Sequence, residues 1–197
     1  MAVKALDVSN WGGYCDFHEA RALGYRHVIV RLSSERPGKR DIAIQQLQAA
    51  QEAGMTTSGY SWPYFDQDPA EFADRCMQIA VDAGTPLKYV WLDLEGAAPP
   101  SNMFAWAWEF YRGVGADQPC GIYTGPGWWL KYGQPAATLR EGRRVPLWLA
   151  HYDGIAKLRD EYMPLYPWRA LAAKQYQGTT TVAGVSADLN VVGKRYV

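Results

Sequence analysis

The strongest constraint on the fold is a repeated alternation of strand-like and helix-like segments. The run 27–33 is almost continuously apolar or β-branched, which is typical of a strand buried on both faces of a parallel sheet. Apolar residues at helical spacing follow from Asp41 to Gly54, and a further helical pattern runs from Asp68 to Gly84. Parallel strands need crossovers of this kind, so the alternation predicts an α/β fold.

The pattern changes in the last third of the chain, where helical segments become rare. Strands are expected at 4–9, 27–33, 56–62, 88–95, 120–124, 146–151, 172–177 and 187–192, and helices at 17–23, 41–53, 69–84 and 102–113. We therefore predict an irregular TIM-like β/α barrel, with five β/α units followed by about three strands with few helices. An open doubly wound sheet is the alternative, but no Gly-rich phosphate loop follows the first strand.

The 197 residues are expected to form a single domain, 1–197, because apolar runs are evenly spread and no linker separates them. Lys and Arg together number 20, as do Asp and Glu, so no net charge would attract nucleic acid. No apolar run approaches the length of a membrane span, and the first residues lack the pattern of a signal peptide. We expect a monomer that is made in the cytoplasm and does not insert into membranes.

The cysteines and histidines give no sign of a metal or redox site. Cys15, Cys76 and Cys120 are odd in number and lack metal-like spacing, so reduced thiols are expected. The three histidines are scattered along the chain, and ordinary surface or core positions are expected for them. We expect neither a metal nor a cofactor.

Two acids at the end of the fourth expected strand are the most informative chemical feature. The apolar, aromatic run 88–96 ends in Asp93 and Glu95, which period-two geometry places on one face with backbones roughly 6.6 Å apart. Barrel enzymes place their chemistry at the carboxyl ends of parallel strands, and glycosidic cleavage requires paired carboxylates. A strand that merely enters an acidic loop would look the same, so the motif needs support from elsewhere in the chain.

That support comes from acids at both ends of the sequence. Asp7 ends the first expected strand, and Asp188 lies near the end of the last one. The first and last strands of a closed barrel are neighbours, so these acids could meet Asp93 and Glu95 at one mouth. Taken singly, Asp7 and Asp188 could equally be turn or cap residues that bond local backbone.

Several motifs, taken in order, resemble the lysozymes of glycoside hydrolase family 25, or Chalaropsis-type muramidases. The resemblance covers nearly the whole chain and rests on Asp7-Val-Ser-Asn-Trp-Gly12, Leu23-Gly-Tyr25, Val28-Ile-Val-Arg31, Gly59-Tyr60, Trp91-Leu-Asp-Leu-Glu95, Gly121-Ile-Tyr-Thr124, Pro146-Leu-Trp-Leu-Ala150, Gln175-Tyr176, Gly184 and Asp188-Leu-Asn190. Two departures affect expected substrate contacts. The family commonly has a His after its third-strand Tyr, where this chain has Ser61-Trp62-Pro63, and a Trp before the Gln-Tyr pair, where this chain has Lys174.

The resemblance implies a peptidoglycan hydrolase that cleaves the β-1,4 bond between N-acetylmuramic acid and N-acetylglucosamine. Glu95 is the expected general acid, because neighbouring Asp93 would raise its pKa, while Asp93 is expected to stay ionised and to orient the substrate's N-acetyl group. Asp7 and Asp188 would tune charge and position. A direct attack by an activated water remains open beside this substrate-assisted route, and so does the choice between a retaining and an inverting outcome.

Aromatic side chains at strand ends are the expected substrate-binding residues. Tyr60, Tyr123, Tyr176, Trp148 and Trp62 could stack on sugars or bond the acetamido group, although ordinary barrel packing is the competing interpretation. The expected partner is therefore the glycan strand of peptidoglycan.

Two other functions fit the same acid pair. One is a non-catalytic glycan-binding or virion structural domain, and the other is a hydrolase of another N-acetylated glycan such as chitin. As a muramidase, the protein would act on the cell wall, either outside the cell or after release during phage lysis, as an endolysin or virion-associated lysin.

Overall fold

The predicted fold class is confirmed by a closed eight-stranded barrel in a computed structural model, which describes residues 2–33, 37–133, 145–158, 168 and 170–197. The strands follow sequence order around the barrel: β1 (Ala2–Val8), β2 (His27–Arg31), β3 (Thr56–Ser61), β4 (Val90–Leu94), β5 (Cys120–Thr124), β6 (Leu147–Ala150), β7 (Ala173–Val182) and β8 (Val185–Gly193). The helices are α1 (Phe17–Ala22), α2 (Pro37–Glu52), α3 (Pro69–Ala83), α4 (Met103–Val114), α5 (Pro126–Tyr132) and the 3₁₀ helix η4 (Lys194–Tyr196).

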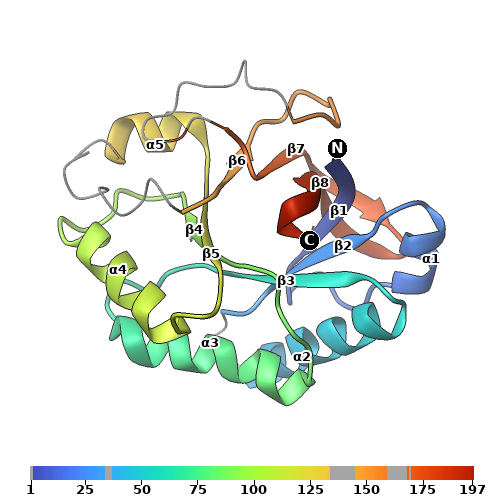
Figure 1. The fold of residues 1–197 in the computed structure, drawn as a ribbon, viewed down its shortest axis with the longest axis horizontal. Helices are drawn as coiled ribbons and strands as arrows, with labels where there is room; N and C mark the ends of the chain where they lie inside the picture. Colours follow the sequence, from blue (N-terminus) through green and yellow to red (C-terminus); the bar gives the residue numbers. More distant parts are fainter. Residues whose placement is uncertain (1, 34–36, 134–144, 159–167, 169) are drawn as a thin grey trace.

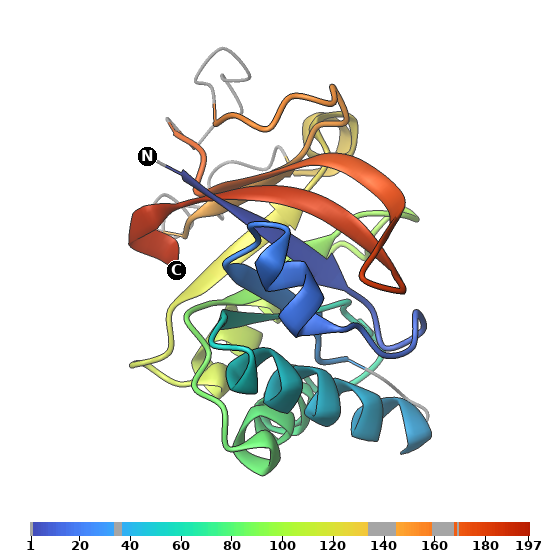
Figure 2. The same ribbon diagram turned by 90° about the vertical axis from the view of Figure 1, so that its right-hand side faces the viewer.

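The barrel is asymmetric because its last strand runs against the others. Strands β1 to β7 pair in parallel, whereas β8 pairs antiparallel with both β7 and β1. Helices α2, α3 and α4 pack side by side along one flank, and the β7–β8 hairpin, orange to red, forms the opposite side (Figures 1 and 2). Both chain ends lie at the same end of the barrel in the two views. The carboxyl ends of β1 to β7 therefore share the other end, where the predicted acids lie.

The apolar residues form two layers, one inside the barrel and one between the sheet and its helices. Trp148 is the centre of the inner layer, with ring centroids 4.5 Å from Tyr123, 5.9 Å from Trp91 and 6.2 Å from Tyr60. Burial of rings of this size contributes much of the free energy of folding. The inner layer comprises Ala5, Ile29, Tyr60, Trp91, Tyr123, Trp148, Ala150, Ala172, Ala173 and Val192.

Local signals fix the helix ends. The Asp16 side chain caps α1 by accepting a hydrogen bond from the Glu19 N–H, and Asp68 caps α3 in the same way. Gly84 ends α3 in the left-handed conformation, with φ of 61°. Helix α2 was expected to open at Asp41, but it begins four residues earlier, so Asp41 lies within the helix.

The main differences from the expected strands lie near the site. β4 ends at Leu94, so Glu95 follows the strand instead of belonging to it. β7 and β8 are longer than expected because Thr179–Thr181 belong to β7, and the chain turns at Ala183 and Gly184, which both have positive φ. Helix α5, which supplies the fifth β/α unit, had no predicted range.

Two further features concern the chain as a whole. Within the described residues, no helix combines the length and apolar character that crossing a membrane requires. Cys15, Cys76 and Cys120 are free, as predicted, and burial raises the pKa of each thiol to about 12.

Close contact between strands inside the barrel predicts a strong effect for Gly121→Ala. A Cβ on Gly121 would overlap the Trp91 ring, which is itself fully buried. We expect a loss of about 1–3 kcal/mol in the free energy of unfolding, because the interior has no room to repack. Urea denaturation measures this loss, with Gly127→Ala as control, since nothing lies within 4 Å of a Cβ there. Equal stability of the two variants would contradict the described packing.

Candidate active site

The closing of the barrel places two of the predicted acids face to face. Asp7 on β1 and Asp188 on β8 are direct partners in the antiparallel register. Opposite residues in such a pair point to the same face of the sheet, so two like charges lie together at the mouth. Asp7 is 7% exposed, and Asp188 is partly exposed.

The amide of Gln175 on β7 bridges these two carboxylates. Its Nε2 donates to Asp7 Oδ2 at 3.0 Å and to Asp188 Oδ2 at 2.9 Å. Its Oε1 accepts hydrogen bonds from the hydroxyls of Tyr123 and Tyr152, each at 2.7 Å. Because both tyrosines donate to this oxygen, the amide orientation is fixed and its N–H groups face the acids.

A second amide connects Asp7 to the barrel interior. Asn190 Nδ2 donates to Asp7 Oδ2 at 2.6 Å, and Asn190 Oδ1 accepts a hydrogen bond from the Trp148 indole at 2.8 Å. Asp7 is thus held by two neutral donors, which stabilise its carboxylate without adding charge.

Asp93 and Glu95 occupy different environments at the end of β4. Asp93 is 4% exposed, and its Oδ1 has no hydrogen-bond partner among the described residues. Glu95, just past the strand, is partly exposed. The deeper acid is enclosed by protein, and the outer one faces the mouth.

Burial raises the pKa of all four acids, and repulsion from neighbouring acids adds to the rise for Asp7, Asp93 and Glu95. Burial raises the pKa of Asp7 from 3.8 to about 7, with Asp188 and then Glu95 adding repulsion against the two amide hydrogen bonds. Burial also raises the pKa of Asp188, opposed by the Thr179 backbone N–H. Each acid on β4 is therefore near enough to the β1–β8 pair to interact with it.

The acid pair at the end of β4 differs from expectation in two respects. Repulsion between Asp93 and Glu95 was expected to raise the pKa of Glu95, but it raises that of Asp93. Burial raises the pKa of Asp93 well above its usual range, with Glu95 and Asp7 adding repulsion and Arg31 opposing. Burial and Asp188 also raise the pKa of Glu95, again opposed by Arg31. Asp93 was expected to stay ionised, but an enclosed carboxylate with an unpaired oxygen favours the protonated form in the free protein.

Arg31 and Trp62 form one wall beside the acid pair. The Arg31 guanidinium carbon lies 6.0 Å from the Trp62 ring centroid. Ser33 Oγ accepts hydrogen bonds from the Trp62 backbone N–H at 2.8 Å and from Arg31 Nε at 3.4 Å. A Cβ on Gly96 would lie 3.1 Å from the Trp62 ring, so this glycine lets the indole approach the chain directly after Glu95. The structure therefore brings Trp62 to the acids.

The other predicted aromatic residues divide into three groups. Tyr123 reaches the mouth through its hydrogen bond to Gln175, and Tyr60 lies in the same inner layer, where burial and then Asp7 raise its pKa. Trp148 is 1% exposed and lies below them in the barrel core.

Tyr176 lies apart from this set. Burial and the nearby Tyr25 raise its pKa. The pairing of β7 with β8 is irregular between Gln175 and Gln177, so Tyr176 lies where strand alternation is interrupted, and it is Gln175 that reaches the acids. The structure therefore does not bring Tyr176 to the predicted site.

Tyr152 takes the place at the mouth that sequence reasoning assigned to Tyr176. It is 62% exposed, and its hydroxyl also lies 3.4 Å from that of Tyr123. Besides burial, Glu95, Asp188 and Asp7 raise its pKa. Gln175, Asn190 and Arg31 were likewise given no role, although all three belong to the quoted motifs. Alternation along β7 and β8 could have indicated Gln175 and Asn190, whereas Tyr152 lies in a loop that carries no periodic signal.

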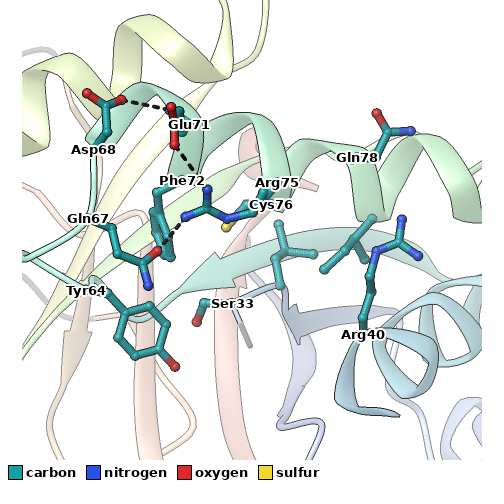
Figure 3. A pocket seen from close by; sticks show the side chains of 12 residues that line it. Ser33, Arg40, Tyr64, Gln67, Asp68, Glu71, Phe72, Arg75, Cys76 and Gln78 are labelled. Carbon is teal, nitrogen blue, oxygen red and sulfur yellow. Dashed lines mark hydrogen bonds and ion pairs between the residues drawn. The ribbon is translucent and has the colours of Figure 1, made fainter. Parts of the chain in front are cut away.

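A separate cavity of about 660 Å³ lies between α2 and α3 and shares Ser33 with the Arg31–Trp62 wall (Figure 3). Its lining includes Tyr64 and Arg75. Figure 3 shows Arg75 reaching Gln67 and Glu71, and its Nη1 lies 3.8 Å from the Glu71 carboxylate. The positive charge of Arg75 is thus paired with a neighbouring carboxylate, whereas the four acids of the candidate site lie beside one another as like charges.

Comparison with known proteins gives a consistent result. The profile of Glycosyl hydrolases family 25 matches residues 6–185. A probable GH family 25 lysozyme 3 from Dictyostelium discoideum is 31% identical over 175 residues, covering 83% of this chain and 35% of that protein. This chain thus spans about a third of that relative's length. A probable GH family 25 lysozyme 2 from the same organism is 27% identical, covering 96% of this chain and 90% of that protein.

Solved structures share the fold. A family GH25 lysozyme from Aspergillus fumigatus superposes with a TM-score of 0.73 at 20% sequence identity, covering 98% of this chain and 94% of the other.

The raised pKa of Asp7 predicts that its charge destabilises the fold at neutral pH. The folded state favours protonated Asp7, so folding stability falls as pH rises from about 4 to about 7, where the folded-state carboxyl ionises. Asp7→Asn keeps the shape and removes the charge. We expect the variant to gain up to a few kcal/mol over the unmodified protein at pH 8 and little at pH 4, because one pKa unit corresponds to about 1.4 kcal/mol.

Urea unfolding at the two pH values measures this difference. Asp16→Asn is the matched control, because Asp16 is an exposed helix cap that Asn can replace. A gain for Asp7→Asn that is equal at pH 4 and pH 8 would contradict the electrostatic explanation.

Proposed function

Because the chain belongs to glycosyl hydrolases family 25, we propose that it is an N-acetylmuramidase that cleaves the β-1,4 bond between N-acetylmuramic acid and N-acetylglucosamine in peptidoglycan. The observation that carries this proposal is the register that sets Asp7 of β1 opposite Asp188 of β8, at the barrel end where Asp93 lies on β4 and Glu95 directly follows that strand. Carboxyl groups with raised pKa values, gathered at the carboxyl end of barrel strands, suit general acid catalysis near neutral pH.

Glu95 is the proposed general acid. It is the more exposed member of the β4 pair, so it can reach the glycosidic oxygen, and its raised pKa keeps a proton available. During cleavage, the proton moves from Glu95 to the leaving oxygen while the bond from that oxygen to the anomeric carbon breaks.

Asp93 is proposed to orient the acetamido group of the substrate. An acetamido N–H placed against Asp93 Oδ1 would satisfy an oxygen that lacks a partner among the described residues, and it would stabilise ionised Asp93. The proton held by the pair would then reside on Glu95. The acetamido oxygen could attack the anomeric carbon, and water would later open the resulting ring, with net retention of configuration.

The remaining side chains are proposed to shape the sugar site. Tyr60, Tyr123, Tyr152 and Trp62 lie beside the acids and could contact sugar rings or the acetamido group. Trp148 is proposed to support them from below, because it is almost fully buried.

The proposal extends to organisation and place of action. We propose that residues 1–197 form one catalytic domain, because β1 and β8 close a single barrel from opposite ends of the sequence. We further propose that it acts as a monomer on the bacterial cell wall, with glycan strands as its partner.

Glu95→Gln is expected to lower the rate of peptidoglycan cleavage by at least about 10²-fold, because the amide cannot protonate the leaving oxygen. Cell-wall digests would be reduced and analysed by mass spectrometry to identify the sugar that carries each new reducing end. N-acetylmuramic acid is the expected sugar. Glu109→Gln is the control, because Glu109 lies on α4 in an exposed pair with Arg112.

Two results would count against the muramidase. If the unmodified protein binds the wall but releases no fragments, a non-catalytic glycan-binding domain is the better description. If new reducing ends appear on N-acetylglucosamine, or chitin is the preferred substrate, another N-acetylated glycan is the target.

A further inference from the structure

An ion pair lies directly behind the Gln175 bridge. Lys174, the residue before Gln175 on β7, has a side chain that is 0% exposed, and its Nζ lies 2.8 Å from Asp153 Oδ1 and 2.9 Å from Asp153 Oδ2. The Asp153 side chain is 18% exposed. Burying a charged pair costs desolvation free energy, so such a pair contributes more to a defined geometry than to stability.

The ion pair fastens the segment after β6 to β7. Two backbone hydrogen bonds join the same parts, from His151 N to Gln175 O at 2.9 Å and from Gly154 N to Tyr176 O at 3.0 Å. Asp153 also accepts a hydrogen bond from the Ile155 N–H at 2.9 Å, which holds the carboxylate toward its own loop. Residues 151–154 are therefore attached to β7 on both sides of Tyr152.

Tyr152 is the residue that this attachment controls. Although its side chain is 62% exposed, its hydroxyl donates to Gln175 Oε1 at 2.7 Å. A Cβ on Gly178 would lie 3.6 Å from the Tyr152 ring and 3.8 Å from Asp188 Oδ1, so the ring extends over β7 toward the acids. An exposed tyrosine keeps one geometry only if its backbone is held.

We propose that Lys174 and Asp153 are positioning residues, which hold Tyr152 over Gln175 so that the Gln175 amide directs both N–H groups at Asp7 and Asp188. This inference rests on the proposed function, because its effect on turnover requires a hydrolase. Lys174 lies on the opposite face of β7 from Gln175, so the pair acts through Tyr152 and not by contact with substrate.

The pair can be tested by removing both charges together. Lys174→Met/Asp153→Asn removes both charges of the Lys174–Asp153 pair at once, and the amide oxygen introduced at position 153 can still accept the Ile155 hydrogen bond. Asp153→Asn alone is a milder second variant if the double variant unfolds early. Lys157→Met is the matched control, because Lys157 is an exposed lysine of the same loop.

The first measurement needs no catalysis. The protein would be labelled with 3-fluorotyrosine, and the Tyr152 resonance identified by its loss in Tyr152→Phe. In the folded double variant we expect this resonance to move toward the position of free tyrosine, while Lys157→Met leaves it in place. An unmoved Tyr152 resonance would overturn the proposal.

The second measurement is hydrolysis of soluble, uncrosslinked glycan strands. Misplacement of Gln175 is expected to lower kcat about tenfold or more, with a smaller change in KM. In a Tyr152→Phe background, the same double substitution should cost little further, since the hydroxyl it positions is already absent. An equal loss in both backgrounds would show that the pair acts by another route and would overturn the proposal. If the unmodified protein cleaves nothing, the proposed function fails, and the fluorine resonance still decides the positioning role.

Discussion

The antiparallel pairing of β8 with β1 is the constraint on which the site depends. It closes the barrel, and its register sets Asp7 opposite Asp188. Two carboxylates in this arrangement repel each other, and the pair tolerates the repulsion through raised pKa values and through hydrogen bonds from neighbouring amides. A parallel last strand would change this register, so one strand's direction determines the electrostatics of the whole mouth.

Neutral amides, more than cations, organise these acids. Gln175 and Asn190 contact Asp7 directly, and each is oriented by an aromatic donor, a tyrosine hydroxyl or the Trp148 indole. Burial, and then repulsion from Asp188, keep the pKa of the Asp7 carboxyl high against these two hydrogen bonds, which fix its position. Arg31 acts on the other two acids, because its positive charge limits the rise in the pKa of Asp93 and of Glu95.

The barrel, its five β/α units and the acids that the structure brings together could be predicted from the sequence. Hydrophobic periodicity and turn residues act over a few neighbouring positions, so they can be read directly from the sequence. The sequence misplaced features that depend on tertiary contacts. Tyr176 was assigned to the mouth, yet it lies near Tyr25, at an irregularity in the pairing of β7 with β8, and Gln175 is the residue that reaches the acids. Tyr152 reaches the acids from a loop, and no local pattern marks such a residue. The burial of Asp93, which favours its protonated form, likewise depends on residues distant in sequence.

The seam between β1 and β8 also has a consequence for biosynthesis. Asp7 is translated 183 residues before Asn190, which donates a hydrogen bond to it from strand β8. On the ribosome, the Asp7 carboxylate therefore waits for strands β2 to β7 before its partner on β8 emerges. Pairing so distant in sequence slows folding. The candidate site at the barrel mouth therefore stays incomplete during synthesis until β8 has emerged.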